Sequence, residues 1–143
     1  TTEIYTLSLH DALPIWAEIV KAINRQSEPR EKLRSYVLTR LKVFRELANY
    51  YSAVKNDFLT SYAFIENMRA RYDREEVDII CQILVEGVEK GKLSIPDPER
   101  AAMAIVTAIK GLEFPLAFNA DSSMDQRLSD MMSLMYHGIK KAE

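Results

Sequence analysis

The chain has 143 residues, a formal net charge of −2 and a hydrophobic share of 48%. This share is sufficient for the core of one domain, and the near-neutral charge argues against a chain whose main task is to coat nucleic acid. The single cysteine, Cys81, excludes an internal disulfide and a cysteine-rich zinc site. Few glycines and prolines, and no apolar run near the roughly 20 residues that cross a bilayer, favour a soluble, cytoplasmic, all-α domain.

Residues 1–15, TTEIYTLSLHDALPI, differ from the rest of the chain because they contain two acids, no base and no helical period. The string resembles the translation of a sequencing adapter, so we expect a non-native or disordered leader and a native part that starts near Trp16. A genuine disordered or strand-like N-terminus is the alternative. A secretory signal is disfavoured because the segment has neither a basic beginning nor a continuous apolar stretch.

The next two segments are predicted to be helical. Residues 16–24 have apolar side chains at helical spacing, namely Trp16, Ile19, Val20 and Ile23. Pro29 then suits the first turn of a new helix, where its missing N–H costs nothing. That second helix runs from about Arg30 to Tyr51 with an apolar face formed by Leu33, Val37, Leu41, Phe44, Leu47, Ala48 and Tyr51. Arg40 breaks the pattern, since it falls on the apolar side.

A third helix is predicted over about residues 56–71, with Phe58, Tyr62, Ile65 and Met68 on one side. Asp73 and Glu76 have the spacing of a capping box, which predicts the start of a fourth helix. Its expected core stripe is Val77, Ile80, Cys81, Leu84 and Val88. Gly91 is a natural left-handed residue to end it.

The fifth predicted helix, Glu99 to about Phe118, begins after the start signal Asp97-Pro98 and has two neighbouring seams. The small seam is Ala101, Ala104, Ala108, Gly111 and Pro115, and the large seam is Ala102, Ile105, Ile109, Leu112 and Leu116. A small seam lets another helix approach closely, whereas a large seam fills a core. A final helix after Ser123 carries Met124, Leu128, Met131, Met135 and Gly138. The prediction is an all-α bundle of about five to six helices.

Chemistry typical of enzymes and metal sites is sparse. His137 is the one histidine outside the leader, and no carboxylate lies three or four residues from it, so we expect it to be exposed or capping. Cys81 lies on an apolar stripe, so we interpret it as a small buried hydrophobic side chain and not as a reactive thiol. We therefore expect no catalytic residue, no metal and no cofactor, and a protein that is not an enzyme.

Eight of the thirteen aromatic residues lie between Tyr36 and Tyr72. They suit a ligand cavity, although simple core packing explains any one of them as well. Arg40 needs a partner because an unpaired buried charge is costly. That partner is either an internal acid such as Glu66 or Glu113, which we favour, or an anionic ligand. The candidate ligand-binding residues are Arg40, Phe44, Tyr51, Phe58, Met68, Tyr72, Cys81, Leu84 and Phe114.

The last two helices carry the clearest signal for association. Four of the six methionines lie on the final helix, and a flexible methionine face opposite a small seam suits a helix–helix interface. Doubled across a two-fold axis, the two helices would form a four-helix bundle and a homodimer. A monomer core closed by these helices is the alternative. The candidate dimer residues are Ala101, Ala104, Ala108, Gly111, Pro115, Met124, Leu128, Met131 and Met135.

From about Trp16 onward the chain resembles the C-terminal regulatory domain of TetR-type transcriptional repressors. The resemblance rests on the order of the helices and on the phrases EKLR (31–34), YDREE (72–76), EGVEKG (86–91) and KGLEFPL (110–116). It implies that residues 16–26 are the remnant of the last helix of the DNA-binding domain with its linker, and that residues 27–143 form the regulatory domain. The pattern of the family's helix-turn-helix is nowhere in this chain.

The resemblance further implies a dimer that binds an apolar or anionic small-molecule effector in a cavity among the second to fifth helices. Effector binding would change the spacing of the two DNA-binding domains of the dimer, which is allostery between the effector site and the DNA-binding site. This chain would reach DNA only through the missing N-terminal domain, and no membrane is involved. The alternative is a stand-alone dimeric helical interaction module without a ligand cavity.

Overall fold

The computed structural model describes residues 16–55, 67, 70, 73–118 and 122–143. Residues 16–24 are helical, and four longer helices follow in the described part: α2 (Pro29–Lys55), α4 (Asp73–Glu89), α5 (Pro98–Phe118) and α6 (Ser122–Ile139). The predicted all-α class is confirmed, and within these residues the β structure is a single isolated bridge between Leu93 and Lys140. The helix predicted over residues 56–71 lies outside the described residues, apart from Asn67 and Ala70, which are helical.

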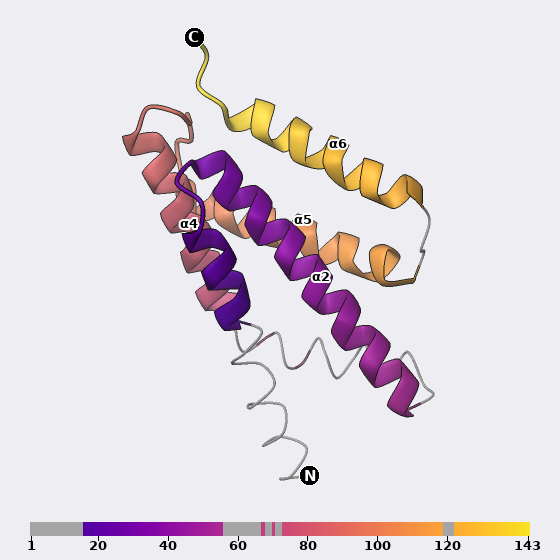
Figure 1. The fold of residues 1–143 in the computed structure, drawn as a ribbon. Coiled ribbons are helices and arrows are strands. Elements are labelled where there is room, and N and C mark those ends of the chain that lie inside the picture. Colours follow the sequence, from indigo (N-terminus) through magenta and orange to yellow (C-terminus); the bar gives the residue numbers. More distant parts are fainter. Residues whose placement is uncertain (1–15, 56–66, 68–69, 71–72, 119–121) are drawn as a thin grey trace.

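The core lies where the helix at residues 16–24, α2, α4 and α5 bring their apolar sides together (Figure 1). Its buried members from these elements are Ile19, Ile23, Leu33, Tyr36, Val37, Leu41, Ile80, Ile83, Leu84, Ala102, Ile105, Val106 and Ile109. The apolar face predicted for α2 and the large seam predicted for α5 supply many of these residues. None of the helices in the described part of the chain combines the length and the apolar character that a membrane span needs.

The buried face of α4 matches the predicted one at Ile80 and Leu84 and differs from it elsewhere. The residues that it buries are Glu76, Ile80, Ile83, Leu84 and Gly87. Val88, expected in the core, is exposed, while Val77 and Cys81 are half-buried. The apolar pattern predicts that Val77, Cys81 and Val88 face the core. In the structure α4 is rotated so that Glu76 and Gly87 face the neighbouring elements, where Glu76 pairs with Arg40 and Gly87 contacts Leu93.

The turn after α4 is tightly built. Gly91 has a φ of 68°, and the amides of Gly91 and Lys92 donate to the carbonyls of Val88 and Gly87 at 3.0 and 2.9 Å. The left-handed residue at the helix end confirms the predicted role of Gly91. A Cβ on Gly87 would overlap the Leu93 side chain and lie 3.3 Å from that of Pro29. Glycine at this position therefore lets the turn and the start of α2 pack directly on α4.

The end of α6 is fastened to this same turn. Ser94 donates its amide to the carbonyl of Ile139 at 2.8 Å, and Lys141 donates to the carbonyl of Lys92 at 3.2 Å. Leu128, nearer the start of α6, is buried in the core. Figure 1 shows α6 returning from the end of α5 toward the turn after α4. These contacts fix the helix at its C-terminal end and at Leu128.

Candidate functional site

A buried polar cluster joins α2 to α4 at the position that sequence analysis singled out. Arg40 of α2 and Glu76 of α4 are 4% and 5% exposed. The Arg40 Nε donates to Glu76 Oε1, and its Nη2 lies 3.3 Å from Glu76 Oε2. Tyr36, one turn before Arg40, donates its hydroxyl to Glu76 Oε1 at 2.5 Å. The carboxylate therefore neutralises the guanidinium and accepts hydrogen bonds at both of its oxygens.

The expectation that an internal acid pairs with Arg40 is confirmed, but the acid is Glu76. The side chains of Glu66 and Glu113, which the sequence suggested, lie outside the described residues. Helix α4 does begin at Asp73, whereas the Glu76 side chain is used by Arg40 and Tyr36 instead of capping the helix. Leaving a buried guanidinium without a carboxylate costs more folding free energy than leaving one helix amide hydrogen-bonded to water. The Glu76 side chain therefore pairs with Arg40 and does not cap the helix.

Asp73, in the same first turn of α4, forms an ion pair with α5. Its Oδ1 lies 2.5 Å from Nζ of Lys110. This ion pair ties the first turn of α4 to the middle of α5. The acidic first turn of α4 also carries Glu75, which is exposed. Negative charge at this end of a helix complements the helix dipole, as expected from the sequence.

The remaining candidate ligand-binding residues are only partly described. Phe44 on α2 and Leu84 on α4 are buried, and Cys81 on α4 is half-buried against the core. The side chains of the others lie outside the described residues, namely Tyr51, Phe58, Met68, Tyr72 and Phe114. The cavity among these residues therefore stays a prediction. An anionic ligand at Arg40 would have to compete with Glu76 for the guanidinium.

The two predicted seams of α5 have opposite environments. Ala102, Ile105 and Ile109 of the large seam are buried, whereas Ala104, Ala108 and Gly111 of the small seam are exposed. Ala101 is half-buried, and the Pro115 side chain lies outside the described residues. Among the described residues, no atom outside its own helix backbone and chain neighbours lies within 4 Å of a Cβ built on Gly111. The small seam is thus an open surface along α5.

On α6 the predicted interface residues are more covered than expected. Leu128 is buried within its own chain, Met131 and Met135 are half-buried, and Met124 lies outside the described side chains. Leu134, which is not among the predicted interface residues, is 74% exposed and is the most exposed large apolar side chain among the described residues. It lies three residues after Met131 and four before Gly138, a helical spacing that could have revealed it.

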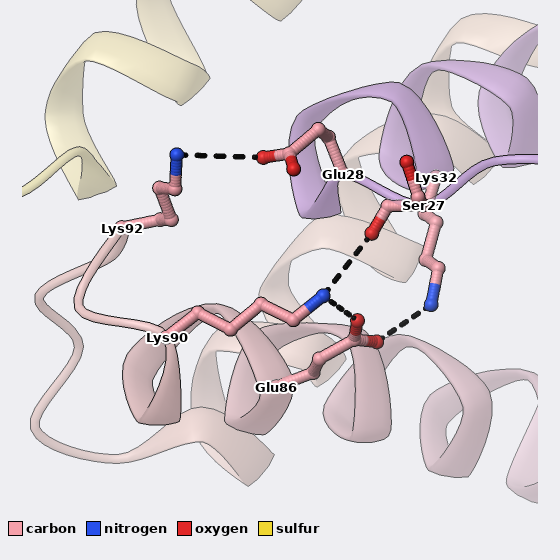
Figure 2. A network of polar contacts seen from close by, with 6 residues as sticks. All are labelled: Ser27, Glu28, Lys32, Glu86, Lys90 and Lys92. Carbon is pink, nitrogen blue, oxygen red and sulfur yellow. Dashed lines mark hydrogen bonds and ion pairs between the residues drawn. The ribbon is translucent and has the colours of Figure 1, made fainter.

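A second charge cluster joins α2 to α4 near the surface (Figure 2). Glu86 of α4 accepts from Lys32 of α2 at 2.7 Å and from Lys90 at 2.6 Å, and Lys90 also donates to the Ser27 carbonyl at 3.2 Å. Hydrogen bonds from Lys32 and Lys90 lower the pKa of the Glu86 carboxyl, and the hydrogen bond with Glu86 in turn raises the pKa of Lys90. These hydrogen bonds and ion pairs join the start of α2 to the last turns of α4.

The described residues offer little for metal or nucleophilic chemistry. Within them, no group of three or more His, Cys, Asp or Glu side chains could hold a metal ion. His137 is exposed, and its Nδ1 lies 2.7 Å from the carbonyl oxygen of Ser133. The buried polar cluster is an ion pair within the chain, and the small seam of α5 is exposed.

Comparisons with solved structures show similarity in fold over almost the whole chain. A transcriptional regulator from Cytophaga hutchinsonii ATCC 33406 is 17% identical, with a TM-score of 0.71, and the match covers 98% of this chain and 76% of that one. A regulatory protein in the tetR family from Rhodococcus RHA1 is 18% identical, with a TM-score of 0.63 and coverage of 98% and 74%. A protein of unknown function from Rhodococcus sp. RHA1 is 12% identical, with a TM-score of 0.65 and coverage of 96% and 72%.

No family model and no curated protein matches the sequence. At these levels of identity the similarity shows the fold alone, which is all-helical and shared with these solved structures.

Proposed function

We propose that residues 27–143 form the effector-sensing and dimerisation domain of a TetR-like transcriptional regulator. The observation that carries the proposal is the fold, because two of the matched structures are described as regulators and the match covers 98% of this chain in each case. In this proposal an N-terminal DNA-reading domain contacts the operator, and the regulatory domain transmits effector binding to it. Regulation, rather than catalysis, is the activity proposed.

The open seam of α5 supports the dimer. An exposed strip of alanine and glycine lets a second helix approach closely, and Leu134 of α6 adds apolar surface that association would bury. Two copies related by a two-fold axis would pair their α5 and α6 helices into a four-helix bundle. The dimer is thus proposed at the surface that the monomer core leaves uncovered.

Gly111→Leu tests this interface. The new Cβ has no described atom of another element within 4 Å, so we expect the monomer to fold, whereas a close partner helix would be overpacked. We expect the dissociation constant of the dimer to rise at least about tenfold, measured by analytical ultracentrifugation. Gln82→Leu places the same side chain on the exposed side of α4 and should leave association unchanged. A wild-type chain that stays monomeric at micromolar concentration would refute the interface.

Cys81 offers a test of effector sensing, because it is the single cysteine and belongs to the predicted cavity. A panel of apolar and anionic small molecules is screened for compounds that raise the unfolding temperature. An effector bound in the predicted cavity should also slow modification of Cys81 by a thiol reagent, with Cys81→Ser as the control for labelling elsewhere. Stabilisation without protection of Cys81 would place the ligand elsewhere.

The second candidate function is a dimeric helical interaction module without a cavity. The buried pairing of Arg40 with Glu76 favours it, because this pairing already supplies the partner that an anionic effector would otherwise provide. A chain that dimerises, but is stabilised by no compound of the panel, supports the interaction module over the effector-sensing domain.

A further inference from the structure

A cavity of about 560 Å³ lies between the first half of α2 and residues 128–136 of α6. Its lining residues are Arg30, Glu31, Leu33, Arg34, Leu38, Leu128, Ser129, Met132, Ser133, Met135 and Tyr136. None of them belongs to the predicted ligand-binding set around Arg40. The volume is in the range of small-molecule sites, about 300–1,000 Å³.

One part of the lining is apolar and accessible. Leu38 of α2 is 45% exposed, and Met132 and Met135 of α6 are half-buried. Methionine side chains are flexible and polarizable, so they adapt their shape to apolar ligands. An apolar tail placed here would cover surface that the chain itself leaves in contact with water.

The other part of the lining is charged. Arg30 lies over the ring of Tyr136, with its guanidinium carbon 4.7 Å from the ring centroid. Arg34, one turn further along α2, is exposed at the cavity. Glu31 is the one acid among the described lining residues, so these residues carry a net positive charge from the two arginines. Guanidinium groups bind carboxylates through paired hydrogen bonds.

We infer that this cavity binds a small amphipathic anion, a carboxylate on an apolar tail. The carboxylate is held by Arg34 and Arg30, and the tail lies along Leu38, Met132 and Met135. A neutral apolar compound would leave the arginines unused, and a cation would be repelled by them. The described lining shares no residue with the predicted effector-binding set, although Leu128 and Met135 also belong to the candidate dimer residues, and the inference does not depend on effector sensing.

The test is a titration of the full chain, labelled with ¹³C in its methionine methyl groups, with decanoate followed by NMR. We expect the signals of Met132 and Met135 to shift in a saturable manner, while the exposed Met103 of α5, which is outside the lining, stays unchanged. Each signal is assigned from a single Met→Leu variant.

Two variants and one analogue test the chemistry. Arg34→Gln should raise the dissociation constant about tenfold or more, whereas Arg45→Gln, at another exposed arginine of α2 outside the lining, should leave it unchanged. Ser129→Trp should fill the cavity and abolish the shifts. Decanol has the same tail without the charge and should bind at least about tenfold more weakly.

Three results would overturn the inference. The first is the absence of any shift at Met132 and Met135 up to the solubility limit of decanoate. The second is an equal affinity for decanol or an unchanged affinity in Arg34→Gln. The third is a shift of Met103 as large as that of Met132, which indicates non-specific adsorption. Dimerisation and protection of Cys81 are measured separately, so failure here leaves the proposed function intact.

Discussion

Two charge clusters join the same pair of helices, and burial gives them different consequences. Glu86 with Lys32 and Lys90 lies near the surface, whereas Glu76 with Arg40 is almost fully buried. A surface ion pair contributes about 0–1 kcal/mol, because water solvates the separated charges nearly as well. Removing one partner of a buried pair costs about 3–5 kcal/mol, because the other charge is left without water or a partner. The degree of burial of an ion pair, more than its chemical type, determines how much the loss of one partner lowers the free energy of unfolding.

The largest expected effect is that of Glu76→Ala, which leaves Arg40 without the carboxylate in the core. We expect the free energy of unfolding to fall by about 3–5 kcal/mol, measured by urea denaturation. Glu75→Ala removes an exposed acid from the same turn of α4 and should change stability little. The double variant Arg40→Met with Glu76→Leu should recover much of the loss. A loss below about 1 kcal/mol in Glu76→Ala would mean that the buried pair contributes no more than a surface ion pair, which would contradict the effect assigned to burial.

Gly87→Ala disturbs the end of α4 that carries the surface cluster without removing any charge. The added Cβ would overlap the Leu93 side chain, so we expect a loss of about 1–3 kcal/mol. Gly138→Ala, at a helical glycine whose added Cβ has no described atom of another element within 4 Å, should be neutral or slightly stabilising. Thermal unfolding of both variants checks this contrast. Equal stability of the two would show that the close packing of Leu93 on Gly87 has no energetic importance.

Tyr36→Phe removes one hydrogen bond from the buried cluster and keeps the ion pair. We expect a loss of about 1–2 kcal/mol, because the hydroxyl donates to a buried carboxylate. Tyr136→Phe changes a half-buried tyrosine on α6, whose ring contact with Arg30 is retained, and should have a smaller effect. Urea denaturation measures both. If Tyr36→Phe were neutral, the Arg40–Glu76 pair would satisfy the carboxylate alone.

The smallest effect is expected for Glu86→Gln, with a loss below about 1 kcal/mol that shrinks further at high salt. The pKa of Glu86 is lowered in the folded state, so its contribution is complete above its ordinary value of 4.5. This contribution is lost as the pH falls through the lower folded-state value. Denaturation of wild type and variant near neutral pH and in acid, at low and high salt, measures the difference. A difference that grows in acid would contradict the assigned cause.

Much of the fold can be predicted because local patterns determine it. Apolar spacing locates α2 and α5, and start and stop signals at Pro98 and Gly91 locate helix ends that the structure confirms. The large seam of α5 is buried as its side-chain sizes predict, whereas the small seam is exposed and its role as an interface stays a prediction. Periodicity suffices there, because every side chain on one face of a helix meets the same neighbour.

What the sequence by itself determined is therefore that the described segments are helical and that the charge of Arg40 needs a partner. Only the tertiary structure decided that this partner is Glu76, that α4 buries Gly87 instead of Val88, and that α6 leaves a cavity over α2. These features depend on how one helix is rotated against another. A charge that is costly to bury and a glycine that permits close approach set this rotation, and each depends on residues distant in the sequence.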